Sequence, residues 1–334
     1  MVYIYRKVIG NKNYYYLRAS IKKEGKSVTK DIAYLGNDLE KIHQELDLLT
    51  TYQKEIRKAY KTINNFIQTN RCLEKVKSLK IKNDLFLSKE SLQNIEACKL
   101  HWQKEFLKLN NLTQEEILKQ FIIEFAFNTA SIEGNTITLK QAQNLLMENL
   151  TPKNKTLREI HDLQNTEKVF LNIYEHLNQE LDENLISNIH DSLLENIDNR
   201  KGYRTDEVRV FKMNFKSTPA KYVKADMKIL MNWYKENKHK LHPLVLSTLF
   251  HHKFEKIHPF MDGNGRTGRM LMNFILLKNN YPPIIIRKKN RTEYLNKLNK
   301  ADECDLDKAE KKYYKDLIEF TSFEVKDNYW DLFL

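Results

Sequence analysis

The chain is poor in the residues that bend or cross-link a backbone. Its 334 residues include eight glycines, six prolines and three cysteines. Glycine is therefore about 2% of the chain, where roughly 7% is usual, which excludes collagen-like and glycine-rich low-complexity proteins. The cysteines are odd in number and far apart, so they indicate neither a disulfide framework nor a metal-binding spacing: Cys72, Cys98 and Cys304.

Long apolar segments are also missing. No stretch approaches the roughly 20 apolar residues of a membrane span, and the first residues, MVYIYRK, lack the apolar core of a signal peptide. We therefore expect a soluble, cytoplasmic protein with no membrane partner. With 41% hydrophobic and 30% charged residues the chain can bury a core, which excludes a disordered protein. Its length is about twice that of a typical domain, so we expect two cooperating units.

Positive charge gathers near the N-terminus. The whole chain has 56 Lys and Arg against 44 Asp and Glu, a net charge of +12. Residues 1–80 hold 17 basic and 8 acidic residues, a balance of +9, while residues 300–334 hold 6 and 10, a balance of −4. Such a basic region suits nucleic acid or another acidic partner. Lys-rich surface is common, however, and no nucleic-acid motif accompanies it, so this partner stays an open alternative.

The first 37 residues predict a small antiparallel β-sheet. Three runs rich in Tyr, Val and Ile, at Val2–Val8, Tyr14–Lys22 and Ser27–Leu35, are separated by turn signals at Gly10 and Gly25. We expect them to form an accessory module whose partner the sequence does not name.

Helical patterns fill most of the remaining chain, so we expect a mainly α protein. Apolar spacing predicts helices over 39–68 and 89–109, within a helical connector that spans 38–112. Further helices are expected over 156–179, 183–197, 224–240, 242–256, 266–279 and beyond 291, with a C-terminal helical extension over 303–334.

Local signals place one more helix and a hairpin. The capping box Thr113–Glu116 predicts that a helix begins at Thr113. Gly134 predicts that the same helix ends after Glu133. Between Glu207 and Val223 the pattern alternates instead, which predicts a short β-hairpin that turns near Met213.

The segment from 258 to 269, HPFMDGNGRTGR, holds three of the eight glycines: Gly263, Gly265 and Gly268. Its Gly-Asn-Gly run lets backbone N–H groups turn inward, and a helix expected to begin at about Arg266 adds its N-terminal dipole. Arg266 and Arg269 lie three residues apart on that first turn, and their guanidinium groups suit phosphate oxygens. The segment therefore predicts an anion-binding cradle.

Two other side chains of this loop suit phosphate chemistry. Asp262 supplies a hard oxygen ligand that Mg²⁺ accepts alongside phosphates and water. His258 lies at the end of the preceding helix, where an imidazole of pKa about 6.5 can take a proton from an attacking hydroxyl. A triphosphate with its metal would fill such a site. The cradle reads the phosphates and not the base, so a nucleotide other than ATP, or a phosphate-linked metabolite, remains an alternative.

At these residues the sequence resembles the Fic family of the Fic/Doc superfamily. The family signature His-x-Phe-x-Asp/Glu-Gly-Asn-Gly-Arg-x-x-Arg is matched at every defined position, and the likeness extends over about 114–302. The resemblance implies a helical bundle with a β-hairpin flap over 113–302. It also implies transfer of AMP from ATP, with Mg²⁺, to a Ser, Thr or Tyr hydroxyl of a target protein or of the enzyme itself.

The resemblance assigns a role to each position. His258 is implied as the general base and Asp262 as the metal ligand. The nucleotide phosphates are implied to contact Gly263, Asn264, Gly265, Arg266, Gly268 and Arg269. A phosphorylating branch of the superfamily carries Lys at the position of Gly265, so this glycine favours nucleotidyl transfer. Homodimers occur in the family.

A second motif resembles the inhibitory helix of the self-inhibited Fic class. The run Thr129-Ala-Ser-Ile-Glu133-Gly134 matches the pattern Ser/Thr-x-x-x-Glu-Gly/Asn and implies an inhibitory helix over about 113–134. A Glu133 carboxylate paired with Arg269 would occupy the partner of the γ-phosphate, so ATP would bind only unproductively.

Two readings compete with a self-inhibited transferase. In the first, Glu133 positions water, and the same site removes AMP from a modified protein. In the second, the Fic core is a regulated nucleotide-binding adaptor that holds nucleic acid or protein through the basic N-terminal sheet. The adaptor would survive His258→Ala and would fail when Lys22, Lys23 and Lys26 are neutralised.

Overall fold

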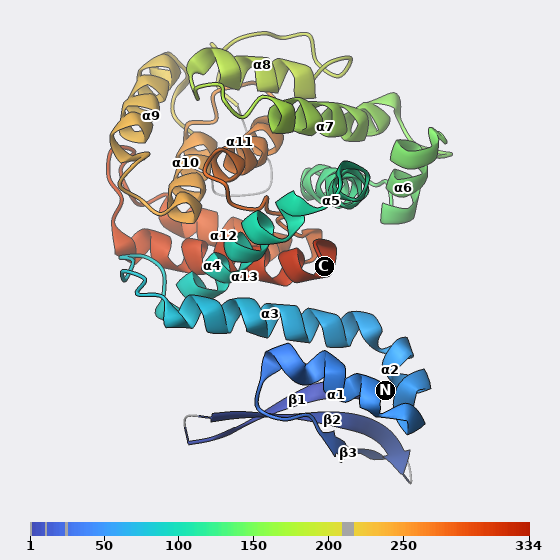
Figure 1. The fold of residues 1–334 in the computed structure, drawn as a ribbon. Coiled ribbons are helices and arrows are strands. Elements are labelled where there is room, and N and C mark those ends of the chain that lie inside the picture. The colour runs from blue at the N-terminus through green and yellow to red at the C-terminus, as the bar shows by residue number, and fades with distance from the viewer. Residues whose placement is uncertain (1, 11, 24–25, 209–216) are drawn as a thin grey trace.

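A computed structural model describes residues 2–10, 12–23, 26–208 and 217–334 (Figure 1). Within these ranges the protein is mainly helical with one small sheet, as the sequence predicts. None of the helices in the described ranges is long and apolar enough to cross a membrane. The sheet lies at one end of the molecule, and α1 to α3 separate it from the remaining helices (Figure 1).

The N-terminal sheet has three antiparallel strands in the order β1-β2-β3: β1 Val2–Ile9, β2 Lys12–Lys23 and β3 Lys26–Tyr34. One face packs against the helices in a cluster that joins Ile4 and Leu17 of the sheet to Ile63 and Ile67 of α3 (Tyr60–Ser78). The predicted antiparallel sheet is confirmed.

The helix predicted over 39–68 is broken in the structure. It consists of η1 Leu39–Lys41, α1 Ile42–Leu48, η2 Thr50–Tyr52, α2 Gln53–Lys58 and the start of α3. The backbone leaves the helical region at Leu49, where ψ is 66°, just before the β-branched pair Thr50 and Thr51. The helical spacing of apolar residues continues on both sides of this short interruption. Periodicity alone therefore predicted one continuous helix.

α3 links two hydrophobic cores. Its first half contributes Ile63 and Ile67 to the sheet cluster, while Cys72 and Val76 belong to the main core. α4 (Lys89–Lys104), which is followed by η3 (Phe106–Lys108), packs entirely within that main core through residues such as Trp102. The domain boundaries predicted from the sequence stay a prediction.

The main core is a bundle of helices with α10 and α11 at its centre, where nearly every side chain is buried. The remaining elements are α5 Asn111–Ile132, α6 Leu139–Glu148, α7 Leu157–Glu175, α8 Glu183–Leu193, η4 Ala220–Tyr222, α9 Val223–Asn237, α10 Pro243–Ile257, α11 Asn264–Lys278, η5 Lys288–Asn290, α12 Arg291–Ala301 and α13 Lys311–Leu332.

Several predicted boundaries need correction. α5 begins at Asn111 and not at Thr113, because the side chain of Asn110 caps it by accepting a hydrogen bond from the Thr113 N–H at 3.0 Å. Its predicted end is confirmed, with Glu133 as the C-cap. α8 ends at Leu193, four residues early, and α6 was not predicted although its buried stripe has helical spacing.

The predicted hairpin cannot be compared in full. Residues 209–216, which include its expected turn at Met213, lie outside the described ranges. Its expected C-terminal end is not a strand, because residues 220–222 form η4 and lead directly into α9.

Candidate active site

The loop between α10 and α11 begins with an abrupt change of backbone direction. α10 ends at Ile257, and His258 follows it in the left-handed conformation, with φ 53° and ψ 60°. That conformation costs a non-glycine residue roughly 1–2 kcal/mol. Gly263, with φ 75°, starts α11 one residue before Asn264. Six residues therefore lead from the end of one buried helix to the positive N-terminal end of another.

Phe260 and Asn264 lock this loop from inside. The Phe260 ring is fully buried and stacks on the His190 ring of α8, with centroids 3.6 Å apart. The Asn264 amide accepts a hydrogen bond from the Phe260 N–H at 2.9 Å and donates one to the Phe260 carbonyl at 2.8 Å. The Asn264 side chain is thus committed to the loop, and the predicted contact of Asn264 with phosphate stays a prediction.

Arg204 holds the beginning of the loop. Its buried guanidinium donates to the His258 carbonyl at 2.7 Å, and its backbone N–H donates to the Pro259 carbonyl at 2.9 Å. These bonds satisfy two carbonyls directly beyond the end of α10. Arg204 therefore fixes the orientation in which His258 leaves the helix.

His258 is neutral at physiological pH. Burial lowers its pKa to about 4, although a hydrogen bond to the Glu255 backbone carbonyl and the charge of Glu133 act in the opposite direction. The Glu255 carboxyl lies 4.0 Å from Nδ1 of His258, and burial raises the pKa of this carboxyl to about 8. A neutral imidazole beside a mostly protonated carboxyl can accept a proton, as a general base must.

Glu133 and Arg269 form an ion pair across the site. Nη2 of Arg269 lies 2.7 Å from Oε1 of Glu133, and the Thr129 hydroxyl and carbonyl accept from the same guanidinium at 2.7 and 3.1 Å. Arg269 is 3% exposed and Glu133 44% exposed. Although burial raises it, the pKa of Glu133 is held below its usual value by the Arg269 charge. The last turn of α5 thus covers the first turn of α11.

This contact requires glycine at position 265. A Cβ on Gly265 would lie 2.1 Å from Oε1 of Glu133 and 3.1 Å from Nη1 of Arg269. A side chain there would displace the carboxylate, so the absence of one is what lets Glu133 reach Arg269.

Asp262 belongs to a chain of alternating charges that joins the loop to α7. Its carboxylate accepts from the Gly263 N–H at 2.6 Å, contacts Arg158 and lies 3.6 Å from Arg266, which in turn pairs with Asp162. Burial raises the pKa of Asp262, but Arg266 and Arg158 outweigh it and hold the carboxyl ionised.

The metal-ligating side chains of this loop suit a site in which substrate and water supply most of the ligands. Within the described ranges no group of three or more His, Cys, Asp or Glu side chains could hold a metal ion. Asp262 is a single, partly exposed carboxylate, which suits Mg²⁺ that keeps its waters and is bound mainly through substrate phosphates. An all-protein metal cage is therefore not the chemistry of this loop.

Comparison with known proteins identifies this arrangement. Residues 180–276 match the model of the Fic/DOC family. Over these residues the chain is similar to the Fic/DOC family. Over 71% of its length it superposes on 95% of a Fic domain-containing signalling protein from Bacteroides thetaiotaomicron, with a TM-score of 0.64 and 25% identity. It also shares its fold with Fic-1 of Caenorhabditis elegans, at a TM-score of 0.59 and 21% identity over 89% of this chain and 82% of that one.

Sequence relatives are named as enzymes. The chain is 30% identical over 209 residues, 60% of its length, to Protein adenylyltransferase fic-1 of Caenorhabditis elegans. It is 32% identical over 197 residues, 56% of its length, to Protein adenylyltransferase Fic of Drosophila melanogaster. The matches cover 41% and 39% of those two relatives, so the chain spans about two fifths of the curated relatives that it matches.

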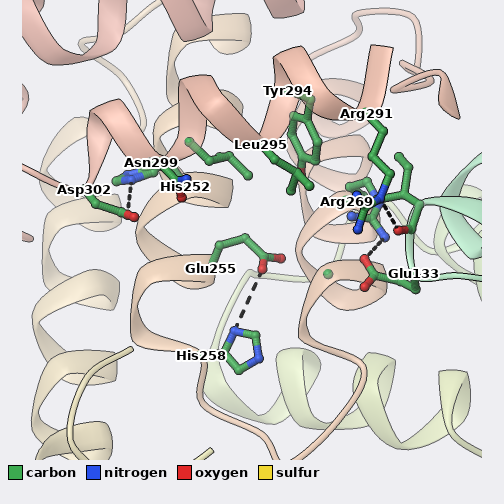
Figure 2. A pocket seen from close by; sticks show the side chains of 13 residues that line it. Glu133, His252, Glu255, His258, Arg269, Arg291, Tyr294, Leu295, Asn299 and Asp302 are labelled. Atoms are coloured by element: carbon green, nitrogen blue, oxygen red, sulfur yellow. Dashed lines mark hydrogen bonds and ion pairs between the residues drawn. The ribbon is translucent and has the colours of Figure 1, made fainter. Parts of the chain in front are cut away.

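A cavity of about 120 Å³ opens beside the loop between α10 and α11. Glu133, Arg269, Gly265, His258 and Glu255 line one part of it, and the other part is formed mainly by α12 and the end of α10. Figure 2 shows the Glu133 carboxylate directed at Arg269 and that of Glu255 directed at His258. The predicted base and the predicted inhibitory glutamate therefore face the same space.

Of the six predicted nucleotide contacts, Gly265 and Arg269 line this cavity, whereas Gly263, Asn264, Arg266 and Gly268 do not. A Cβ at Gly268 would lie 2.7 Å from Nδ1 of His251 and from Oε1 of Glu255, inside the contact of α10 with α11. Gly268 thus allows close packing of the two central helices and does not line the cavity.

The sequence did not predict the partners that hold the loop between α10 and α11. Arg158 and Asp162 are four residues apart on α7, and His190 lies on α8. The spacing of Arg158 and Asp162 would have placed them on one helix face, but no signal in the sequence connects that face to a loop 104 residues later.

Proposed function

We propose that this protein is a protein adenylyltransferase, which transfers AMP from ATP to a Ser, Thr or Tyr hydroxyl of a target protein. One observation carries the proposal: a neutral histidine, 18% exposed, opens onto the same cavity as a buried arginine at the positive end of α11. The names of the sequence relatives support the reaction class.

The proposed reaction needs one proton acceptor and one anion site. His258 accepts the proton of the target hydroxyl, and the hydroxyl oxygen attacks the α-phosphorus of ATP. The bond from that phosphorus to the bridging oxygen breaks, and pyrophosphate leaves. Arg266, Arg269 and the N–H groups at the start of α11 hold the β- and γ-phosphates and stabilise the charge that develops on the leaving group.

Asp262 is the residue that would hold Mg²⁺, which supplies charge neutralisation on the phosphates when it is bound. Arg158 now lies against this carboxylate, so the metal must compete with it. The resident side chains supply base, phosphate contacts and metal ligand within a single loop.

Autoinhibition by Glu133 is part of the proposal. Its carboxylate occupies Arg269, the group proposed to bind the γ-phosphate, and adds a negative charge where ATP brings its own. ATP must displace this pair to bind productively. Release therefore requires that the end of α5 move, or that another contact take Glu133 away.

Labelled ATP tests the reaction class. Glu133→Gly protein is incubated with Mg²⁺, a protein extract and ATP labelled on either the α- or the γ-phosphate. Transfer of the α-label, with none of the γ-label, is expected; transfer of the γ-label would mean phosphoryl transfer and would reject the proposal. Competition with GTP, CTP and UTP tests the base, and a preference for any of them would reject ATP as the substrate.

AMP removal is the second candidate, because the 44% exposed carboxylate of Glu133 shares a cavity with His258. In that position it can orient a water molecule toward an AMP–protein bond. Wild-type protein that releases AMP from a modified target, together with Glu133→Gly protein that does not, would favour removal.

Self-modification and a homodimer are also part of the proposal. Intact-mass spectrometry of the purified protein tests self-modification, and light scattering tests the homodimer.

A further inference from the structure

The outward face of the N-terminal sheet carries a cluster of tyrosines. Val2 and Ile4 of β1 and Tyr15 and Leu17 of β2 are buried against the helices, so the alternate residues of both strands point away from them. The residues on this outward face, called the tyrosine platform below, are Tyr3, Tyr5, Tyr14, Tyr16, Arg18 and Tyr34, all of them partly or fully exposed.

The platform is continuous across the three strands. Tyr16 of β2 is the register partner of Tyr5 in β1 and of Tyr34 in β3. The Tyr34 ring lies 5.2 Å from that of Tyr16 and 6.4 Å from that of Tyr14, centroid to centroid. The Arg18 guanidinium lies 3.3 Å above the Tyr5 ring. The rings therefore lie side by side over the sheet, tilted by 35° and 48° in the two pairs that involve Tyr34.

Stability alone does not explain this composition. The opposite face already packs in its own core with α3, and a solvated sheet face usually carries polar residues. Cross-strand aromatic pairs do stabilise sheets. Five rings cover this face, however, and Tyr34 is 53% exposed, so part of their area lies outside any cross-strand contact. Within the described ranges α1 to α3 lie on the other side of the sheet, and Figure 1 shows the strands at the edge of the molecule.

The charge of the strand module is mostly positive. Residues 1–35 contain eight Lys and Arg and two Asp and Glu, a balance of +6 in a module of three strands. One of the two acidic residues, Asp31, is paired with Arg18. A ligand that fits here combines flat aromatic groups with regularly spaced negative charge.

We propose that the tyrosine platform binds single-stranded nucleic acid. Unpaired bases stack on exposed aromatic side chains with little regard for sequence, while Lys and Arg neutralise the phosphates between them. Double-stranded nucleic acid buries its base faces and cannot use the rings. The proposal is independent of the adenylyltransferase proposal, because it concerns the sheet and not the loop between α10 and α11.

Fluorescence anisotropy tests it with labelled oligonucleotides of about 12 nucleotides, within the usual site size. The probes are single-stranded oligo-U RNA, single-stranded oligo-dT DNA and a DNA duplex of the same length. Tyr16→Leu/Tyr34→Leu removes two rings and Tyr16→Phe/Tyr34→Phe keeps them. Tyr60→Leu, which removes a tyrosine that is 60% exposed outside the sheet, is the matched control.

Wild type and the Phe variant are expected to bind at least one single strand alike and more tightly than the duplex. The Leu variant is expected to bind at least about tenfold more weakly, since each stacked base contributes on the order of 1–3 kcal/mol. Circular dichroism checks the fold, and Tyr34→Leu alone replaces the double variant if the latter unfolds. Comparison of the RNA and DNA strands identifies which of them is preferred.

Three results would overturn the proposal. The Leu variant binding as well as wild type would show that the rings do not contact bases. Equal binding of the duplex would show that the interaction is electrostatic and does not involve base stacking on the rings. No binding of either strand at about 50 mM salt, where electrostatic binding is strong, would leave the platform to a protein partner.

Discussion

Oε1 of Glu133 lies 2.7 Å from Nη2 of Arg269, although the two residues are 136 positions apart in the sequence. Glu133 ends α5 and Arg269 belongs to the first turns of α11, so the pair joins the end of one helix to the beginning of another. Because the same guanidinium is proposed to bind the γ-phosphate, the folded chain carries its own competitor for ATP.

Gly265→Ala is expected to expel Glu133 from this pair. The added methyl group would lie 2.1 Å from Oε1, which is far inside contact distance. Because the clashing atom is the far end of a half-exposed side chain that can move, we expect a loss of at most about 1 kcal/mol in the free energy of unfolding, from the broken ion pair. In the Glu133→Gly background the same change should cost clearly less, because the clashing carboxylate is gone. Urea unfolding of the four proteins measures the difference, and an equal cost in both backgrounds would show that Gly265 and Glu133 are not coupled.

Arg158→Gln is expected to strengthen metal binding at Asp262. The arginine now neutralises the carboxylate that a divalent cation needs. Since Arg158 is 55% exposed, the pair contributes at most about 1 kcal/mol, which corresponds to an increase in affinity of up to about fivefold. Electron paramagnetic resonance of Mn²⁺ with a non-hydrolysable ATP analogue reports the free metal directly, without any turnover.

Lys168→Gln is the control for this measurement. It removes a similarly exposed cation from α7, where Lys168 pairs with Glu195. Unchanged Mn²⁺ affinity in Arg158→Gln, or an equal increase in both variants, would argue against competition at Asp262.

Buried histidines make the folded state sensitive to acid. Burial lowers the pKa of His101 to about 4, from an unfolded value near 6.5. Below pH 6.5 the unfolded chain therefore binds a proton that the folded chain does not, so the stability from this neutral histidine is lost as pH falls toward 4. Relative to pH 7, His101 should cost wild type about 2 kcal/mol at pH 5.

His101→Gln isolates this effect. The variant loses the bond between Nδ1 and the Tyr329 hydroxyl, 2.8 Å in the structure, so its stability at pH 7 should be lower. Its stability should nevertheless fall less than that of wild type between pH 7 and pH 5. Parallel unfolding curves at the two pH values would show that His101 does not titrate with folding.

The sequence predicted the parts of the site that are contiguous. The twelve residues from 258 to 269 carry base, metal ligand, glycines and arginines in one run, and the structure keeps these side chains around one loop. The likeness to a self-inhibited class also placed Glu133 opposite Arg269, and the structure brings the two together. Both inferences rest on short, contiguous sequence motifs, which can be recognised without knowledge of the fold.

The parts that depend on packing could not be predicted in the same way. The side-chain amide of Asn264 is bonded to Phe260, and Gly268 faces the contact between α10 and α11, and no local pattern indicated either arrangement. The pairing of Asp162 with Arg266 joins residues 104 positions apart through the arrangement of α7 on α11. Likewise, the tyrosines predicted the strands of the sheet. That they share one outward face follows only from the pairing register of the three strands.

Intact-mass spectrometry after incubation with Mg²⁺ and ATP tests the central claim most directly. The proteins are wild type, Glu133→Gly and Glu133→Gly/His258→Ala, with circular dichroism to show that all three are folded. The account predicts one or more added AMP groups in Glu133→Gly, little in wild type and none in the double variant. Equal modification of wild type and Glu133→Gly would contradict restraint by Glu133, and modification of the double variant would contradict His258 as the base.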